Sequence, residues 1–137
     1  MNQEQTIQTV DIAVTCNGHL LLIRRTKAPF EDKLVLPGGH VELGESAVEA
    51  IIREALEEIG LVVRAEELRF LIRLDREHRD PRPGRRISLV YHLEISASRL
   101  SECAAASDAR EIVIREISSL NESEIGFDHF EAVRLLQ

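Results

Sequence analysis

The chain has 137 residues, of which 44% are hydrophobic and 30% charged, and its formal net charge is −7. This length predicts one domain over residues 1–137. The acidic balance argues against general nucleic-acid binding, which requires a basic surface. No apolar run approaches the roughly 20 residues that span a bilayer, and Cys16 and Cys103 match no metal-ligand spacing. We therefore expect a cytoplasmic protein that binds neither nucleic acid nor membrane.

The chain begins with segments that predict strands. Residues 7–15 are rich in β-branched side chains, and the turn Asn17-Gly18 joins them to a hairpin partner. A short third strand is expected to end at Pro37-Gly38-Gly39, because proline cannot continue a central strand and glycines permit unusual dihedrals. The predicted strands are residues 7–15, 19–25, 34–36, one or two within 61–74, 87–96 and 111–117.

Two helices are predicted. The first begins at Ser46, which has capping-box spacing with Glu49, and Gly60 supplies its stop. The second is C-terminal and capped by Asp128, whereas residues 75–86 and 99–109 are predicted to be loops. Mixed strands with two helices indicate an α+β or mixed α/β fold. The expected buried stripe of the first helix is Val48, Ile52, Ala55, Leu56 and Ile59.

Three glutamates share one face of the first helix. Glu57 and Glu58 fall within about 60° and 40° of Glu54 around the axis, nearly opposite the expected buried stripe. Like charges at this spacing repel, and a hard cation such as Mg²⁺ or Mn²⁺ would remove the repulsion. A solvated acidic face is the alternative. Arg53 beside the carboxylates and the Gly38-Gly39 turn upstream favour a metal site.

The segment Gly39–Leu61 resembles the Nudix box. That pattern is Gly, five residues, Glu, seven residues, Arg-Glu, an apolar residue, any residue, Glu-Glu, any residue, Gly and an apolar residue. Every fixed position is matched, with Ala55 smaller than the usual aliphatic residue. Such a match is far more specific than a lone glycine motif. The matching fixed residues are Gly39, Glu45, Arg53, Glu54, Glu57, Glu58 and Gly60.

The resemblance implies an α/β/α sandwich with a mixed central sheet, and metal-dependent hydrolysis of a nucleoside diphosphate linked to another group. It implies that Glu54, Glu57 and Glu58 bind Mg²⁺ or Mn²⁺, assisted by the carbonyl of Gly38 or Gly39. The cation would lower the pKa of the attacking water. Family members often dimerise, so a homodimer is left open. Of the remaining box residues, Arg53 would orient a carboxylate, and Glu45 would support the junction between loop and helix.

Some family members take the catalytic base from a loop beyond the box. Glu111, at the end of the loop before the late strand, is the first candidate here. Glu102, Asp108 and Glu94 are alternatives. An ordinary surface carboxylate is the competing interpretation for all four.

A cluster of four arginines in eight residues, 79–86, stands out on this acidic chain. It is either a solvated turn or a local positive field for a diphosphate, with Arg79, Arg82 and Arg85 binding the substrate. Arg79-Asp80-Pro81-Arg82 and Phe127-Asp128-His129 resemble segments of ADP-ribose pyrophosphatases in this family. We therefore expect hydrolysis of ADP-ribose to AMP and ribose 5-phosphate. The alternatives are a (d)NTP pyrophosphohydrolase of the MutT type and a non-catalytic nucleotide-sensing domain.

Overall fold

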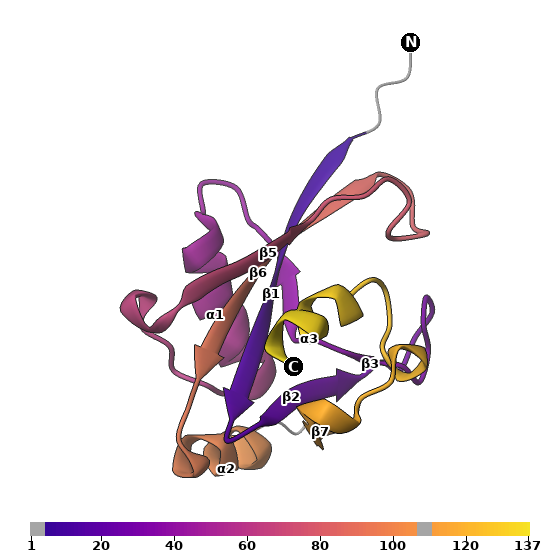
Figure 1. Ribbon diagram of the computed structural model, residues 1–137. Helices are drawn as coiled ribbons and strands as arrows, with labels where there is room; N and C mark the ends of the chain where they lie inside the picture. Colours follow the sequence, from indigo (N-terminus) through magenta and orange to yellow (C-terminus); the bar gives the residue numbers. More distant parts are fainter. Residues whose placement is uncertain (1–4, 107–110) are drawn as a thin grey trace.

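The computed structural model describes residues 5–106 and 111–137, which form a mixed sheet with helices on both of its faces (Figure 1). Within these residues there are seven strands and three α-helices. None of these helices is long and apolar enough to cross a membrane. The strands are β1 (Thr6–Cys16), β2 (His19–Arg24), β3 (Leu34–Val35), β4 (Gly38–His40), β5 (Arg69–Leu74), β6 (Arg85–Glu94) and β7 (Glu111–Glu116), and the helices are α1 (Ala47–Ile59), α2 (Ala97–Ala106) and α3 (Phe130–Leu136).

Strand β1 is the centre of the sheet, whose order is β3-β2-β1-β6-β5, with β4 also pairing with β1 and β7 with β2. It runs parallel to β6 from Thr6 opposite Arg85 to Thr15 opposite Glu94. The other pairings are antiparallel. The predicted hairpin turn is present, and both Asn17-Gly18 residues have positive φ, as its tight geometry requires. The mixed sheet that the sequence predicts is therefore confirmed.

Two apolar cores lie on opposite faces of this sheet, because successive side chains of a strand alternate. Val10 and Ile12 of β1 pack into the core that contains Ile51 of α1. Ala13 belongs to the other core, together with Val133 of α3. In Figure 1, α1 lies behind the sheet and α3 in front of it. This is the α/β/α layering that the sequence resemblance implies.

The ends of helix α1 are as predicted, and its buried face is partly as predicted, because Ala55 and Ile59 of the expected stripe are buried. Ser46 Oγ accepts the N–H of Glu49 at 3.1 Å, the reciprocal bond is present at 2.9 Å, and Gly60 ends the helix with φ 66°. Leu56, expected to be buried, is 56% exposed. The helix packs against β1 and β4, which also buries Ala50 and Ile51. The fully buried residues are Ala50, Ile51, Ala55 and Ile59.

Two further expectations are wrong. Residues 97–106, predicted largely as a loop from their small and polar side chains, form α2, and Cys103 anchors that helix in the core on the α1 side. Residues 61–74 contain the single strand β5, which agrees with the one or two strands expected there. Asp128 does not cap α3, whose N-cap is His129 without a side-chain hydrogen bond. The Asp128 carboxylate binds Arg79 instead.

Candidate active site

Arg53 on α1 joins the loop before the helix to the carboxylates of the helix. Its Nε and Nη2 donate to the two oxygens of Glu45 at 2.8 and 3.0 Å. Its Nη1 donates to Glu54 at 2.8 Å and to Glu57 at 3.2 Å, and its Nη2 also donates to the carbonyl of His40 at 2.9 Å. This geometry supports the expected role of Arg53 in orienting a carboxylate.

Glu45 connects the loop before α1 to that helix. Hydrogen bonds from Arg53, and then from the backbone N–H of Glu42 at 2.9 Å, lower the pKa of Glu45 to about 2. The hydrogen bonds with Glu45 in turn raise the pKa of the Arg53 guanidinium. Both groups are therefore charged near neutral pH. These contacts support the predicted role of Glu45 at the junction between loop and helix.

Glycine is required at positions 38 and 39 because neighbouring backbone and carboxylate atoms occupy the space of a side chain. Strand β3 ends before Pro37 as expected, but neither glycine has positive φ, and both belong to β4, which pairs with β1. A Cβ on Gly38 would lie 2.1 Å from the carbonyl oxygen of Val10, and a Cβ on Gly39 would lie 2.3 Å from Oε1 of Glu54. The missing side chain at Gly39 thus lets the Glu54 carboxylate reach the β4 backbone.

The three box glutamates have different surroundings. The Glu54 side chain is 12% exposed, the Glu57 side chain is 58% exposed, and Glu58 lines a cavity. Because Ala50 and Ile51 are buried beside it, Glu54 flanks the core, whereas Glu57 is exposed to solvent. Within residues 5–106 and 111–137, no three carboxylate, imidazole or thiol groups converge closely enough to hold a metal ion. The donors are all oxygens, which Mg²⁺ and Mn²⁺ prefer, so the site fits such a cation by donor chemistry.

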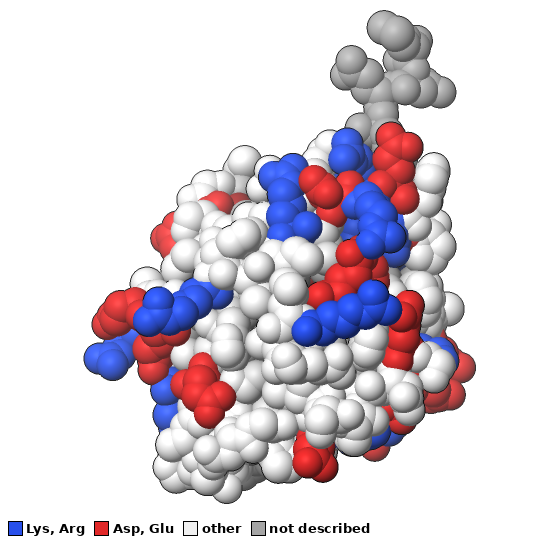
Figure 2. All heavy atoms as spheres, viewed as in Figure 1, with Lys and Arg blue, Asp and Glu red and all other residues white. Residues whose placement is uncertain are grey.

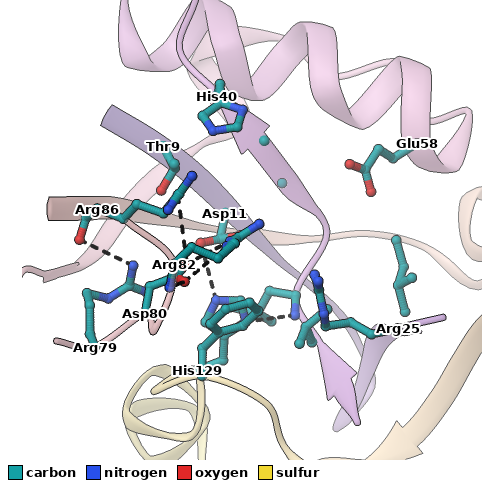
Figure 3. Close-up of a pocket in the computed structure, with 16 residues that line it drawn as sticks. Thr9, Asp11, Arg25, His40, Glu58, Arg79, Asp80, Arg82, Arg86 and His129 are labelled. Atoms are coloured by element: carbon teal, nitrogen blue, oxygen red, sulfur yellow. Dashed lines mark hydrogen bonds and ion pairs between the residues drawn. The ribbon is translucent and has the colours of Figure 1, made fainter. Parts of the chain in front are cut away.

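A cavity of about 300 Å³ opens beside β4. Glu58 projects toward it from α1, and Arg82, Arg86 and Arg25 lie across from Glu58 in Figure 3. The backbone of residues 38–40 forms part of the wall between them. Such a cavity places a carboxylate and several guanidinium groups around one small ligand.

Two arginines of the predicted substrate loop line this cavity but are paired with carboxylates. Arg79 donates to Asp128 through Nε at 2.9 and 3.1 Å and through Nη2 at 2.7 Å, and its side chain is only 5% exposed. Arg82 donates to Asp80 at 3.0 and 2.6 Å, and its guanidinium lies 5.5 Å from the ring centroid of Phe127. The bonds to Asp128 show that Arg79 anchors its loop to the start of α3. In Figure 2, acidic and basic side chains are intermingled on the face shown.

Arg85 does not line this cavity, whereas Arg79 and Arg82 do. Arg85 and Arg86 are consecutive on β6, so their side chains point to opposite faces of the sheet. Arg85 lines a second cavity of about 210 Å³ and donates to the carbonyl of Asp75 at 3.0 Å. Arg79, Arg82 and Arg86 line both cavities.

A buried polar network forms part of the cavity on the α3 side of the sheet. Oδ2 of Asp11 accepts a hydrogen bond from Ser88 Oγ and lies 3.4 Å from Nε2 of His129. Nδ1 of His129 accepts the N–H of Leu36 at 3.1 Å, which places the proton of a neutral ring on Nε2. Burial alone would raise the pKa of Asp11, but the interactions with His129 and Ser88 and the charge of Arg79 outweigh it and lower the pKa. Asp11 is therefore ionised near neutral pH.

None of the described candidates for a catalytic base lies in the cavity. Glu111 of β7 forms an ion pair with Arg24 at 3.0 Å, and its side chain is 59% exposed. Glu94 is hydrogen-bonded at the far end of β6, and Glu102 is exposed on α2. Asp108 lies outside the described residues. The identity of the base stays a prediction.

Comparison with known proteins settles the family. The model of the NUDIX domain matches residues 6–136. The chain belongs to the Nudix family. An ADP-ribose pyrophosphatase from Methanocaldococcus jannaschii is 35% identical over 125 residues, which cover 91% of this chain and 69% of that protein. Family membership and this relative confirm the predicted enzyme class, a pyrophosphohydrolase.

Two further relatives differ in how much they share with this chain. A bifunctional NMN adenylyltransferase/ADP ribose pyrophosphatase from Francisella tularensis, solved with AMP and a Mn ion, has a TM-score of 0.80 and 30% identity. The match covers 99% of this chain but only 42% of that chain. A putative 8-oxo-dGTP diphosphatase from Bacillus subtilis is 54% identical over 49 residues, which are 36% of this chain and 31% of that protein. The solved neighbour confirms the predicted fold, while the second match is restricted to a short segment.

Proposed function

We propose that this Nudix protein hydrolyses ADP-ribose to AMP and ribose 5-phosphate with Mg²⁺ or Mn²⁺. The observation that carries the proposal is the cavity in which Glu58 lies across from Arg25, Arg82 and Arg86. A diphosphate is a dianion, and guanidinium groups bind its oxygens with paired hydrogen bonds. The identity to an archaeal ADP-ribose pyrophosphatase over 91% of the chain supports this substrate.

The cation would be held by Glu54, Glu57 and Glu58, with the carbonyl of Gly38 or Gly39. When bound, it offsets charge on the diphosphate and lowers the pKa of the attacking water. Arg53 holds Glu54 and Glu57 together, and its charge reduces the repulsion between them. Glu58 reaches the cavity and is placed to contact the ligand there.

A (d)NTP pyrophosphohydrolase remains the alternative activity. The B. subtilis relative favours it, but its match covers only 36% of this chain. The nucleotide-sensing alternative has less support, because all box glutamates are intact. We propose a small nucleoside diphosphate as the ligand, and the absence of nucleic-acid binding stays a prediction.

A substrate panel tests this proposal. ADP-ribose, dNTPs, dinucleoside polyphosphates and nucleotide sugars are each assayed with Mg²⁺ and with Mn²⁺. We expect the highest kcat/KM with ADP-ribose and no turnover after chelation. A higher kcat/KM with dNTPs would select the alternative enzyme. Thermal stabilisation by ADP-ribose without turnover of any compound would select the sensor.

Glu57→Gln tests the metal site, because the amide keeps the shape but not the charge of the side chain. We expect kcat to fall about 100-fold or more, with the Tm nearly unchanged because Glu57 is 58% exposed. Glu66→Gln is the matched control, since Glu66 is 71% exposed and lies outside the cavity. Near-normal turnover by Glu57→Gln would remove that residue from the metal site.

Two substitutions, Arg82→Ala and Arg85→Ala, distinguish the cavity seen in the structure from the substrate site predicted from the sequence. Loss of a charge-assisted hydrogen bond costs about 1.5–3 kcal/mol, so Arg82→Ala is expected to raise KM for ADP-ribose about tenfold or more. Arg85→Ala should leave KM unchanged, because Arg85 does not line the cavity. Equal effects of the two variants would contradict the placement of the ligand in this cavity.

A further inference from the structure

The two oxygens of the Asp11 carboxylate differ in their surroundings. Oδ2 is held by Ser88 and faces the Nε2–H of His129. Oδ1 accepts no hydrogen bond from residues 5–106 or 111–137, and it is not among the fully buried atoms that lack a partner. Asp11 lines the cavity, and because Ser88 holds Oδ2, Oδ1 is the oxygen available to a ligand there. The residue facing this oxygen is Gly38, where a Cβ would lie only 2.3 Å away.

The chemistry of this oxygen defines the ligand atom that it can bind. An ionised carboxylate accepts hydrogen bonds and donates none, and leaving it without a donor in a closed site is costly. It repels the phosphate oxygens for which the arginines are suited. The partner of Asp11 is therefore a neutral donor on the same ligand. In ADP-ribose the neutral donors are the ribose hydroxyls and the adenine amine.

The position of Asp11 selects between these donors. Its carboxylate faces Gly38, and the carboxylate of Glu54 faces the next residue, Gly39. Consecutive strand residues face opposite sides, so Asp11 and Glu54 lie on opposite sides of β4. Asp11 nevertheless lines the same cavity as Glu58, which places it close to the region proposed to hold the diphosphate. Each ribose of ADP-ribose is bonded directly to the diphosphate, whereas the adenine amine lies beyond a ribose ring. A ribose hydroxyl is thus the nearer donor.

We propose that Asp11 is a specificity-determining residue that accepts a hydrogen bond from a ribose hydroxyl, so that the enzyme selects ribosyl diphosphates over their deoxy counterparts. Ser88 and His129 are positioning residues that fix the other oxygen. This inference rests on the proposed function, because it assigns one part of ADP-ribose to one wall of the cavity.

Asp11→Asn tests the inference because the network dictates how the amide must lie. Ser88 Oγ and His129 Nε2 both donate toward the Oδ2 position, so the asparagine oxygen must occupy it. The NH₂ group then takes the place of Oδ1. The variant thus presents a donor to the cavity where the wild type presents an acceptor, with little change in shape.

The experiment compares kcat/KM of wild type and Asp11→Asn on ADP-ribose, on analogues that each lack one ribose hydroxyl, and on the inosine analogue, which lacks the adenine amine. Wild type is expected to prefer ADP-ribose about tenfold or more over one deoxy analogue. Asp11→Asn is expected to lose that preference and to keep its response to the other analogues.

Two controls separate recognition from structure. Ser88→Ala removes a donor to Oδ2 but leaves Oδ1 in the cavity, so it should lower the Tm and keep the preference for the hydroxyl. Asp32→Asn removes one exposed carboxylate outside the cavity and should change neither. The Tm of each variant shows whether it is folded.

Three outcomes would overturn the inference in distinguishable ways. An equal loss of kcat/KM on every analogue would make Asp11 a structural residue. Loss of discrimination only against the inosine analogue would assign Asp11 to the base. If wild type hydrolyses dNTPs but no ribosyl diphosphate, the proposed function fails and the inference fails with it.

Discussion

Replacing Asp128 by asparagine tests whether a buried ion pair holds the loop of residues 75–84. Arg79 and Asp128 are 5% and 16% exposed, and three N–O contacts of 2.7 to 3.1 Å join them. Asparagine keeps the shape of the side chain but removes its charge, which leaves Arg79 as a buried cation without a counter-ion in the pair. Removing one partner of a buried pair costs about 3–5 kcal/mol.

The expected loss lies at the lower end of that range. The amide oxygen of the variant still accepts one hydrogen bond, and Arg79 Nη1 lies 3.5 Å from the carbonyl oxygen of Arg86. We therefore expect the free energy of unfolding to fall by about 3 kcal/mol. With an unfolding entropy of about 2.1 cal/mol/K per residue, the 137 residues contribute about 0.3 kcal/mol/K. The Tm should then fall by about 10 °C.

Urea titrations and thermal melts of Asp128→Asn and Asp75→Asn measure this difference. Asp75 pairs with Arg73 at 3.0 Å, but both side chains are about half exposed, at 45% and 55%. Such a surface pair is worth about 0–1 kcal/mol. A loss of stability in Asp128→Asn no greater than in Asp75→Asn would refute the argument that burial makes the first pair important.

Three other substitutions test the box and its helix. Gly39→Ala places a methyl group 2.3 Å from Glu54 Oε1, so kcat should fall about tenfold or more; unchanged kinetics across a metal titration would contradict this. Glu45→Gln removes a carboxylate whose pKa Arg53 lowers from 4.5 to about 2. The stabilisation that the variant loses is present above about pH 4.5 and disappears as the pH falls toward 2. The free energies of unfolding of wild type and variant, from denaturant titrations, should therefore converge over that range. A difference that does not depend on pH would be inconsistent with the ion pair. Ser46→Ala removes the acceptor of the Glu49 N–H and should cost about 1 kcal/mol, or 3–4 °C in Tm by calorimetry; an unchanged Tm would show that the cap is unimportant.

The features predicted correctly from the sequence depend on residues close together in the chain. The cap at Ser46, the stop at Gly60 and the turn at Asn17-Gly18 are set by contacts within a few residues. The spacing of the box glutamates on one helix is equally local. The wrong predictions concern segments whose composition is compatible with both loop and helix, or whose buried side chains are determined by tertiary packing. Small and polar side chains in residues 99–109 predicted a loop, although residues 97–106 form a helix in which Cys103 is buried.

The sequence by itself determined the Nudix box and the reaction class, because one helix and its preceding loop carry that chemistry. The opposite wall of the cavity depended on the tertiary structure. The parallel pairing of β1 with β6 brings Asp11 beside Ser88, which is 77 residues later, and the start of α3 adds His129. Arg25 gave no sequence signal, since one arginine after a strand is ordinary. Only the packing of sheet against helix decides which of these charged side chains share a cavity.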